Sequence, residues 1–174
     1  GSVSGGLFES VNRGNTWHKV ETFVDNLAIS SMCQTIDGTF YVATGHDQEA
    51  NGGSQDAYDS GARGYGVYKS EADGSWTLIE GTQSYTYINE VVCDDINNYV
   101  LIACTQGLIK YDPVAGALSD LGDFPGGAAC PSVAISKDGS LVIAHSVGGG
   151  PSAVWVSNNS GVNFTDVSDL SETP

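Results

Sequence analysis

The segment Gly6–Val20 reads GLFESVNRGNTWHKV, and its pattern returns three more times along the chain. Each copy runs from apolar residues through a polar pair and a turn to an aromatic or apolar residue. The other copies are GVYKSEADGSWTLIE from Gly66, GLIKYDPVAGALSDL from Gly107 and AVWVSNNSGVNFTDV from Ala153. Aligned on Ser10, Ser70, Tyr111 and Ser157, the copies are 60, 41 and 46 residues apart. Two of these steps match the period of about 40–50 residues that is typical of propeller blades.

A second repeated unit lies between these copies. It reads ISSMCQTIDGTFYVATG from Ile29, INEVVCDDINNYVLIACT from Ile88 and PSVAISKDGSLVIAHS from Pro131. In each, two apolar runs flank a turn, and Asp37-Gly38 and Asp138-Gly139 are strong hairpin signals. The two units together predict four-stranded antiparallel blades, which must stack because one such sheet cannot bury both its faces alone. A two-sheet sandwich is the alternative all-β fold, but it does not predict matched units of four strands.

The predicted organisation is all-β, a single propeller segment over residues 1–174 with about three and a half blades. Residues 6–20 are expected to be the outer two strands of a partial blade. Three blades are predicted to follow, at residues 28–80, 87–122 and 131–169. The first of them contains a long loop at 45–65, and the second has lost the turn motif. Because closed propellers have about 4–8 blades, we expect the segment to belong to a larger propeller.

Composition narrows the possible partners. The chain has 21 Asp and Glu against six Lys and Arg, and its formal net charge is −15. This acidity disfavours nucleic acid and anionic membranes, since both require a basic patch. No apolar run approaches the roughly 20 residues of a spanning helix, so membrane insertion is not expected.

The four cysteines, Cys33, Cys93, Cys104 and Cys130, form no CxxC pair. We expect them to act as small buried apolar residues rather than as a disulfide framework.

The turn motif resembles the Asp box, or bacterial neuraminidase repeat, with the pattern Ser-x-Asp/Asn-x-Gly-x-Thr-Trp. The first copy matches at Ser10, Asn12, Gly14, Thr16 and Trp17, with Asn in place of Asp. Ser70, Asp73, Gly74 and Trp76 match with one residue deleted, and Ser157, Asn159, Gly161, Asn163 and Phe164 match more loosely. The stretch from Tyr41 to Trp76 is similar to secreted bacterial proteins of the sortilin-like group. The resemblance implies a propeller that is extracellular or displayed on the cell surface.

The Asp-box residues are interpreted as structural. Ser, Asn and Asp side chains can accept backbone N–H bonds within a turn, and glycine takes a positive φ there without strain. The aromatic residues Trp17, Trp76 and Phe164 are expected to pack between adjacent sheets. Catalysis would need titratable groups that converge on one pocket, whereas these turns lie on different blades.

Candidate binding residues lie at the opposite ends of the blades. In an antiparallel meander the first and third turns share one end, so the remaining connections share the other. The candidates are His46, Asp47, Glu49, Asp56, Tyr58, Asp59 and Arg63 in the 45–65 loop, with Tyr85 and Tyr87 on a neighbouring connection. The loop could contact a ligand or partner, be merely mobile, or hold calcium through its four carboxylates. The tyrosine rings could instead pack under their own loops. No cofactor or resident metal is predicted.

Two function classes follow from these residues. A sialidase-like site needs three arginines and a tyrosine nucleophile, but this chain has two arginines and Arg13 lies in the turn motif. A xyloglucanase-like glycosidase needs two carboxylates about 5–10 Å apart, preferably from facing loops, whereas the candidates here share one loop. We therefore expect a non-catalytic binding or scaffold propeller that presents loops to a protein, peptide or glycan. The alternative is a fragment of an Asp-box glycoside hydrolase, xyloglucanase-like rather than a sialidase.

Overall fold

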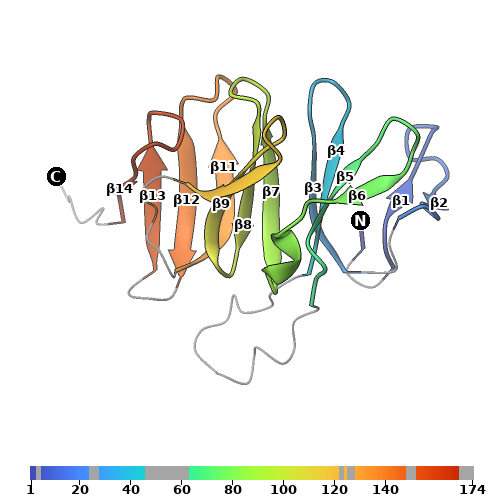
Figure 1. The fold of residues 1–174 in the computed structure, drawn as a ribbon, viewed down its shortest axis with the longest axis horizontal. Helices are drawn as coiled ribbons and strands as arrows, with labels where there is room; N and C mark the ends of the chain where they lie inside the picture. The colour runs from blue at the N-terminus through green and yellow to red at the C-terminus, as the bar shows by residue number, and fades with distance from the viewer. Residues whose placement is uncertain are drawn as a thin grey trace. The chain divides into compact units, whose positions relative to one another are not determined.

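The computed structural model describes residues 1–2, 5–23, 28–45, 63–121, 124, 128–147 and 152–168, which form strands, turns and one short 3-10 helix. They divide into two compact units, Gly1–Ile88 and Asn89–Pro174, which are described separately. The predicted all-β fold of four-stranded antiparallel sheets is confirmed in both units (Figure 1).

The first unit contains a two-stranded and a four-stranded sheet. The small sheet pairs β1 (Phe8–Glu9) with β2 (His18–Lys19). The larger sheet has the order β3-β4-β5-β6, with β3 (Ile29–Gln34), β4 (Phe40–Thr44), β5 (Val67–Ser70) and β6 (Trp76–Leu78). The 3-10 helix η2 (Thr82–Ser84) follows β6.

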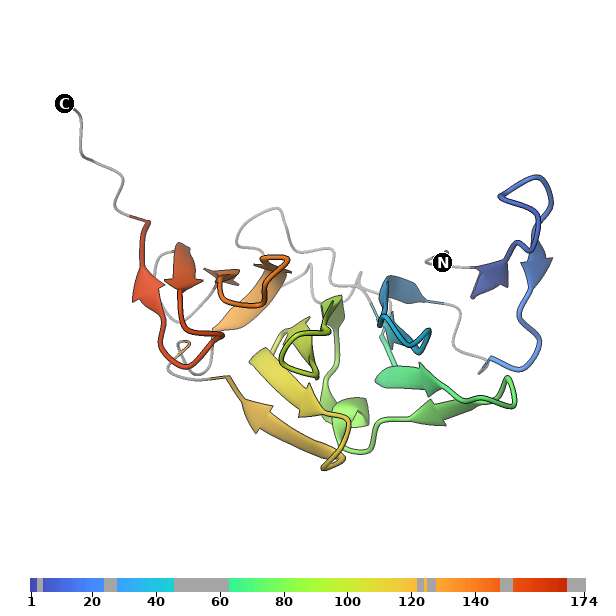
Figure 2. The same cartoon turned by 90° about the horizontal axis from the view of Figure 1, so that it is seen from above.

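The second unit contains two four-stranded sheets. The first has the order β10-β9-β8-β7, with β7 (Ile88–Asp94, which begins at the last residue of the first unit), β8 (Tyr99–Cys104), β9 (Gly107–Asp112) and β10 (Ala117–Asp120). The other has the order β11-β12-β13-β14, with β11 (Ala129–Ile135), β12 (Val142–Val147), β13 (Ala153–Ser157) and β14 (Thr165–Asp166). The turns β7–β8 and β11–β12 lie at the top of Figure 1 and therefore face the reader in the view from above (Figure 2).

The sequence specifies the hairpins that join the first two strands of a sheet. Between β3 and β4 the carboxylate of Asp37 accepts the N–H of Thr39 at 3.1 Å, and Gly38 has a φ of 95°. Between β11 and β12 the carboxylate of Asp138 accepts the N–H of Ser140 at 3.2 Å. The Asp-Gly pairs therefore close these turns by the same side-chain-to-backbone bond.

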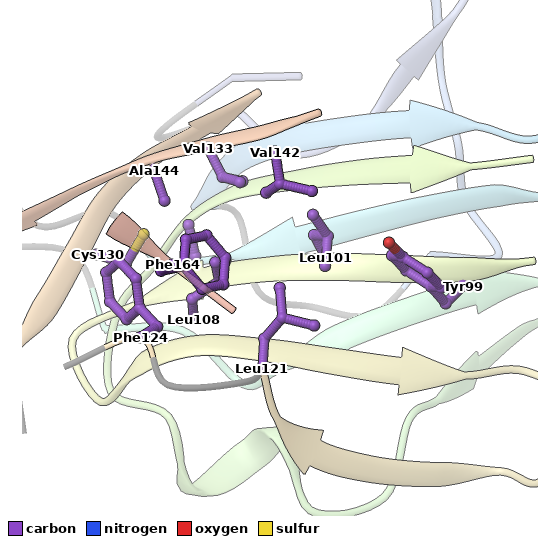
Figure 3. Close-up of a cluster of buried hydrophobic side chains, with 11 residues drawn as sticks. Tyr99, Leu101, Leu108, Leu121, Phe124, Cys130, Val133, Val142, Ala144 and Phe164 are labelled. Carbon is purple, nitrogen blue, oxygen red and sulfur yellow. The ribbon is translucent and has the colours of Figure 1, made fainter. Parts of the chain in front are cut away.

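The core of the second unit lies between its two sheets (Figure 3). Leu101 and Leu108 of one sheet pack in a cluster with Val133 and Val142 of the other, and all four are almost fully buried. Residues outside the strands close this cluster: Leu121, Phe124 and Phe164. The rings of Phe124 and Phe164 meet edge to face with centroids 5.7 Å apart, a favoured aromatic geometry.

The first unit has its own aromatic core, and one prediction fails there. Phe23 meets Tyr68 and Trp76 edge to face, at centroid distances of 5.4 and 5.1 Å. Trp17 was expected to pack between sheets in the same way, but it is 61% exposed. The described β1–β2 sheet has only two strands of two residues, so it offers little surface to cover an indole. The ring instead donates from Nε1 to the carbonyl of Gly14 at 3.1 Å.

The prediction for the cysteines is correct for two of the four. Cys104 and Cys130 are free thiols, both fully buried, and burial raises their pKa to about 11 and about 12. Cys33 and Cys93 are disulfide-bonded, which corrects the expectation of free apolar residues. Neither cysteine belongs to a CxxC pair, so its position in the sequence did not mark it as oxidised.

Candidate functional site

The first turn motif uses its polar side chains internally. Ser10 Oγ accepts the N–H of Gly14 at 2.7 Å and donates to Asn12 Oδ1 at 3.0 Å. Asn12 Oδ1 also accepts the N–H of Thr16 at 2.9 Å. Arg13 and Gly14 both have positive φ, 59° and 85°, which bends the backbone around the serine hydroxyl. The side chains of Ser10 and Asn12 thus take the place of backbone acceptors within the turn.

The last turn motif repeats these three hydrogen bonds at the equivalent residues. Ser157 Oγ accepts the N–H of Gly161 at 2.8 Å and donates to Asn159 Oδ1 at 2.9 Å, while Asn159 Oδ1 accepts the N–H of Asn163 at 2.9 Å. Ser160 and Gly161 have φ values of 58° and 80°. The two turns differ in burial, because Ser157 is only 1% exposed and Phe164 belongs to the core of the second unit.

The two middle turns are closed differently. In the second, Asp73 Oδ1 accepts the N–H of Ser75 at 3.0 Å, and Ser70 Oγ accepts the N–H of Phe40 from the neighbouring strand at 2.9 Å. Between β9 and β10 the carboxylate of Asp112 accepts the N–H groups of Val114 and Ala115. The second turn has one residue deleted and the third has lost the motif, and in both an aspartate accepts the backbone N–H groups in place of the serine-centred network.

These turns also determine the direction of several pKa shifts. Hydrogen bonds from nearby hydroxyls and backbone N–H groups lower the pKa of five aspartates: Asp37, Asp73, Asp112, Asp138 and Asp166. The pKa of Asp138 falls to about 2, mainly through the hydroxyl of Ser136. A general acid needs the opposite shift, a raised pKa, so these five carboxylates are suited to holding turns rather than to donating protons.

Six residues join the chain segments at the other end of sheet β3–β6, and we call them the neck. They are Thr44, Gly45, Gly64, Tyr65, Gly66 and Thr82. Thr44 Oγ1 donates to the carbonyl of Gly66 at 2.7 Å and accepts the N–H of Tyr65 at 2.8 Å. Thr82 Oγ1 accepts the N–H of Val67 at 2.9 Å and donates to the carbonyl of Ile79 at 2.6 Å. Both threonines are fully buried, so each hydroxyl satisfies backbone groups that water cannot reach.

The neck glycines are required by close backbone approach. A Cβ on Gly64 would lie 2.0 Å from the carbonyl oxygen of Thr44, and one on Gly45 would lie 2.4 Å from the nitrogen of Gly64. Gly45 N–H donates to the carbonyl of Ala28 at 2.8 Å, and Gly64 N–H donates to that of Thr86 at 3.2 Å. The backbone at 45 is therefore held directly against the backbone at 64.

The predicted ligand-binding residues are placed unevenly. His46, Asp47, Glu49, Asp56, Tyr58 and Asp59 lie outside the described residues, as does the calcium alternative that depends on them. Arg63 is exposed beside the neck, whereas Tyr85 is half-buried and Tyr87 is only 3% exposed, which keeps its ring from a ligand in this structure. Arg63 and Tyr85 thus remain candidates at this end of the sheet.

Sequence reasoning missed two kinds of residue at this end. Tyr65 is 67% exposed next to Arg63, so it adds an aromatic ring to the candidate surface. Thr44 and Thr82 hold that surface in place but bear no motif. The glycines that flank the long loop, at positions 45, 64 and 66, were the available signal, because glycine permits close backbone contact.

Two further features bear on function. Within the described ranges, no group of three or more His, Cys, Asp or Glu side chains is arranged to hold a metal ion. The same residues include no helix with the length and apolar character needed to cross a membrane.

Comparisons with solved structures show the class of fold. The chain is similar to the GH74 xyloglucanase from Xanthomonas campestris, with a TM-score of 0.68 and 16% identity over 95% of this chain and 27% of that one. It is similar to the extracellular domain of BT4673 from B. thetaiotaomicron, with a TM-score of 0.69 and 17% identity over 99% of this chain and 21% of that one. YCF48 from Cyanidioschyzon merolae matches at a TM-score of 0.59 and 16% identity, over 94% of this chain and 53% of that one.

These neighbours establish a β-propeller fold, and at such identities they establish the fold alone. The protein is a partial β-propeller of about four blades. It spans about a quarter of the xyloglucanase chain and about a fifth of the BT4673 domain. One neighbour is a GH74 xyloglucanase, and another is the extracellular domain of a putative one component system. No protein-family model and no curated protein matches the sequence.

Proposed function

We propose that this chain is a non-catalytic binding or scaffold propeller of the Asp-box, sortilin-like type. The observation that carries the proposal is the matched pair of hydrogen-bond networks at Ser10–Thr16 and Ser157–Asn163. Because their polar side chains are used to close turns, these motifs act as blade corners. Binding is then assigned to the opposite ends of the blades, where Arg63 and Tyr65 are exposed next to the neck.

The ligand class that suits this surface is a protein, peptide or glycan. An exposed phenol offers an apolar face and a hydroxyl, and a guanidinium adds several hydrogen-bond donors. Tyrosine and arginine are enriched where proteins bind one another, and aromatic rings line many small-ligand sites. The chain's net charge of −15 argues against nucleic acid as the ligand.

An extracellular or cell-surface location is part of the proposal. Cys33 and Cys93 are disulfide-bonded, and disulfides persist mainly in oxidising compartments. The BT4673 neighbour is itself an extracellular domain. Purification of the native protein from culture medium or a surface fraction, with both cysteines oxidised, would support this location, whereas recovery from the cytosol would contradict it.

The second candidate is a piece of a glycoside hydrolase, and it rests on the similarity to the GH74 xyloglucanase. The discriminating experiment measures both binding and reducing-sugar release on xyloglucan oligosaccharides and on a wider glycan array. Binding without turnover that is weakened at least tenfold in Arg63→Ala/Tyr65→Ala supports the binding proposal. Val114→Ala, which changes an exposed residue in the β9–β10 turn, is the matched control. Turnover above a no-protein control favours the hydrolase, and neither binding nor turnover on these glycans contradicts both a glycan-binding role and the hydrolase.

A further inference from the structure

The hairpin turns of the second unit carry its most exposed apolar side chains. Ile96 lies in the β7–β8 turn, Val114 in the β9–β10 turn and Val162 in the β13–β14 turn, and they are 65%, 82% and 62% exposed. No other large apolar side chain in the described part of this unit is more than 40% exposed. Single exposed apolar residues are common on protein surfaces, but turns are usually built from Gly, Pro, Asn, Asp and Ser. The turns themselves therefore do not require these aliphatic residues.

The first unit has the same feature. Val11 lies in the turn between β1 and β2 and Ile36 in the turn between β3 and β4, and they are 87% and 90% exposed. At the opposite end of sheet β7–β10, by contrast, the connection from β8 to β9 is Thr105-Gln106, which is polar. Exposed aliphatic residues thus recur at the turn end of the sheets in each unit.

Hydrogen bonds join three turns of the second unit into one surface. Asn97 Nδ2 in the β7–β8 turn donates to the carbonyl of Gly139 in the β11–β12 turn at 3.1 Å. The N–H of Ser160 in the β13–β14 turn donates to the carbonyl of Ser140 at 3.0 Å, and Tyr99 Oη donates to the carbonyl of Ser160 at 3.2 Å. We call this end of the unit the tip surface, and its exposed and charged side chains are Ile96, Val114, Val162, Asp95, Asp112 and Asp138.

The charge of the tip surface is negative. The four turns of this unit and the residues that flank them contain four aspartates, Asp94, Asp95, Asp112 and Asp138, against one lysine, Lys137. The turn hydrogen bonds of Asp112 and Asp138 all reach Oδ1, and they lower the pKa of both carboxyls, so both are charged at neutral pH. Among the described residues nothing donates to Oδ2 of either aspartate. One oxygen of each carboxylate can therefore accept a hydrogen bond from a cationic partner.

The spacing of the turns fits an α-helix. Because the strands alternate in direction, the β7–β8 and β9–β10 turns lie at the same end of their sheet, two strand spacings or about 10 Å apart. Residues i and i+7 of an α-helix lie on one face about 10.5 Å apart. A helix that lies across these turns would place one apolar side chain against Ile96 and another against Val114.

We propose that the tip surface binds an amphipathic helix of a partner protein, with apolar residues two turns apart and Lys or Arg beside them. The apolar residues would contact Ile96 and Val114, and the cationic groups would pair with Asp112 and Asp138. A second copy of this chain would bring the same carboxylates against each other, and an anionic bilayer would be repelled in the same way. The proposal goes beyond the proposed function, because it concerns the turn end of the blades and not the surface beside the neck.

The test is fluorescence anisotropy of a labelled helical peptide titrated with the 174-residue chain. The peptide contains Leu, Lys and Ala, has leucines at positions i and i+7, and is about 18 residues long so that it can form a helix. One control peptide has the same composition in scrambled order, and another has Glu in place of Lys.

Three variants separate the apolar and the charged contacts. Ile96→Ser/Val114→Ser removes the apolar side chains, and each substitution is also made singly so that a variant that fails to fold can be replaced. Asp112→Asn/Asp138→Asn removes two charges and keeps an Oδ1 acceptor for each turn. Val154→Ser is the matched control, since Val154 is a partly exposed apolar residue on a strand of the same unit.

We expect the ordered Leu/Lys peptide to bind at least tenfold more tightly than either control peptide. Its affinity should fall at least fivefold in Ile96→Ser/Val114→Ser and in Asp112→Asn/Asp138→Asn, and less than twofold in Val154→Ser. Equal affinity for the ordered and scrambled peptides, no binding of either, or an unchanged affinity in Ile96→Ser/Val114→Ser would overturn the proposal.

Two other occupants are tested with the same variants. Binding to phosphatidylcholine vesicles, or a dimer in analytical ultracentrifugation, that is lost in Ile96→Ser/Val114→Ser would assign the tip surface to a bilayer or to a second copy, and either result would overturn the proposal. Glycan binding is measured separately with Arg63→Ala/Tyr65→Ala, so failure of the proposed function would leave the peptide result intact.

Discussion

Replacing Gly161 with alanine is expected to destabilise the protein more than replacing Gly14, although both glycines occupy the same place in the same turn. Both have positive φ, 80° and 85°, which costs alanine about 1–2 kcal/mol. A Cβ on Gly161 would also lie 2.9 to 3.1 Å from three carbons of Leu121, whereas one on Gly14 meets only Trp17 at 3.8 Å. Overpacking of this kind adds about 1–3 kcal/mol, so we expect about 2–5 kcal/mol for Gly161→Ala.

The assay is equilibrium unfolding in urea at pH 7, followed by tryptophan fluorescence, with the free energy obtained by linear extrapolation. Trp155 packs against the core of the second unit and reports on the turn that holds Gly161. The double variant Gly161→Ala/Leu121→Ala removes the clash, so its cost should be at least about 1 kcal/mol below the sum of the two single costs. Equal costs for Gly161→Ala and Gly14→Ala, or additivity in the double variant, would refute the reasoning.

The remaining predictions concern the neck, one turn and the oxidised cysteines. Thr44→Val leaves the Tyr65 N–H without its acceptor, so urea unfolding should show a loss of about 1–3 kcal/mol, and Thr35→Val, a less buried change, should show less. The pKa of Asp138 is about 2 when folded, below its ordinary value of 3.8, so its stabilising contribution is complete above about pH 4 and is lost as pH falls toward 2. Asp138→Asn should therefore flatten the acid limb of the Tm-against-pH curve, and an unchanged limb would contradict this. Dithiothreitol should lower the Tm of the unsubstituted chain by several degrees and leave a Cys33→Ser/Cys93→Ser variant unaffected, because only these two cysteines among the four are disulfide-bonded.

The sequence predicted the sheets well because their signals are local. Alternating apolar residues and the Asp-Gly turns act over a few residues, and the hairpins at Asp37 and Asp138 form with the same bond. The strand order follows from consecutive pairing, which short turns favour.

Properties that depend on distant residues were not predictable in the same way. Trp17 and Phe164 occupy the same motif position, yet Trp17 is 61% exposed and Phe164 is 7% exposed. What covers Phe164 is Leu121 and Phe124, which are about 40 residues away in sequence. The oxidised state of Cys33 and Cys93 likewise depends on the fold rather than on their positions in the sequence.

The candidate site was predicted in part. The location of Arg63 and Tyr85 at the end of the blade opposite the turn motifs followed from the meander order alone. The role of Thr44 could not be predicted, because a threonine in an apolar run is typical of an ordinary strand. Only the structure shows that its hydroxyl bonds to Tyr65 and Gly66.

The neck has a consequence for protein engineering. Backbone contacts fix Gly45 and Gly64 against each other. The contacts that hold this end of sheet β3–β6 together therefore lie within the neck itself. The cost of closing a loop grows only slowly with length, by about 0.6 kcal/mol for each doubling. Peptides of quite different length and composition could therefore be exchanged between these two glycines with little effect on the strands. The neck makes this blade a natural acceptor for grafted recognition sequences.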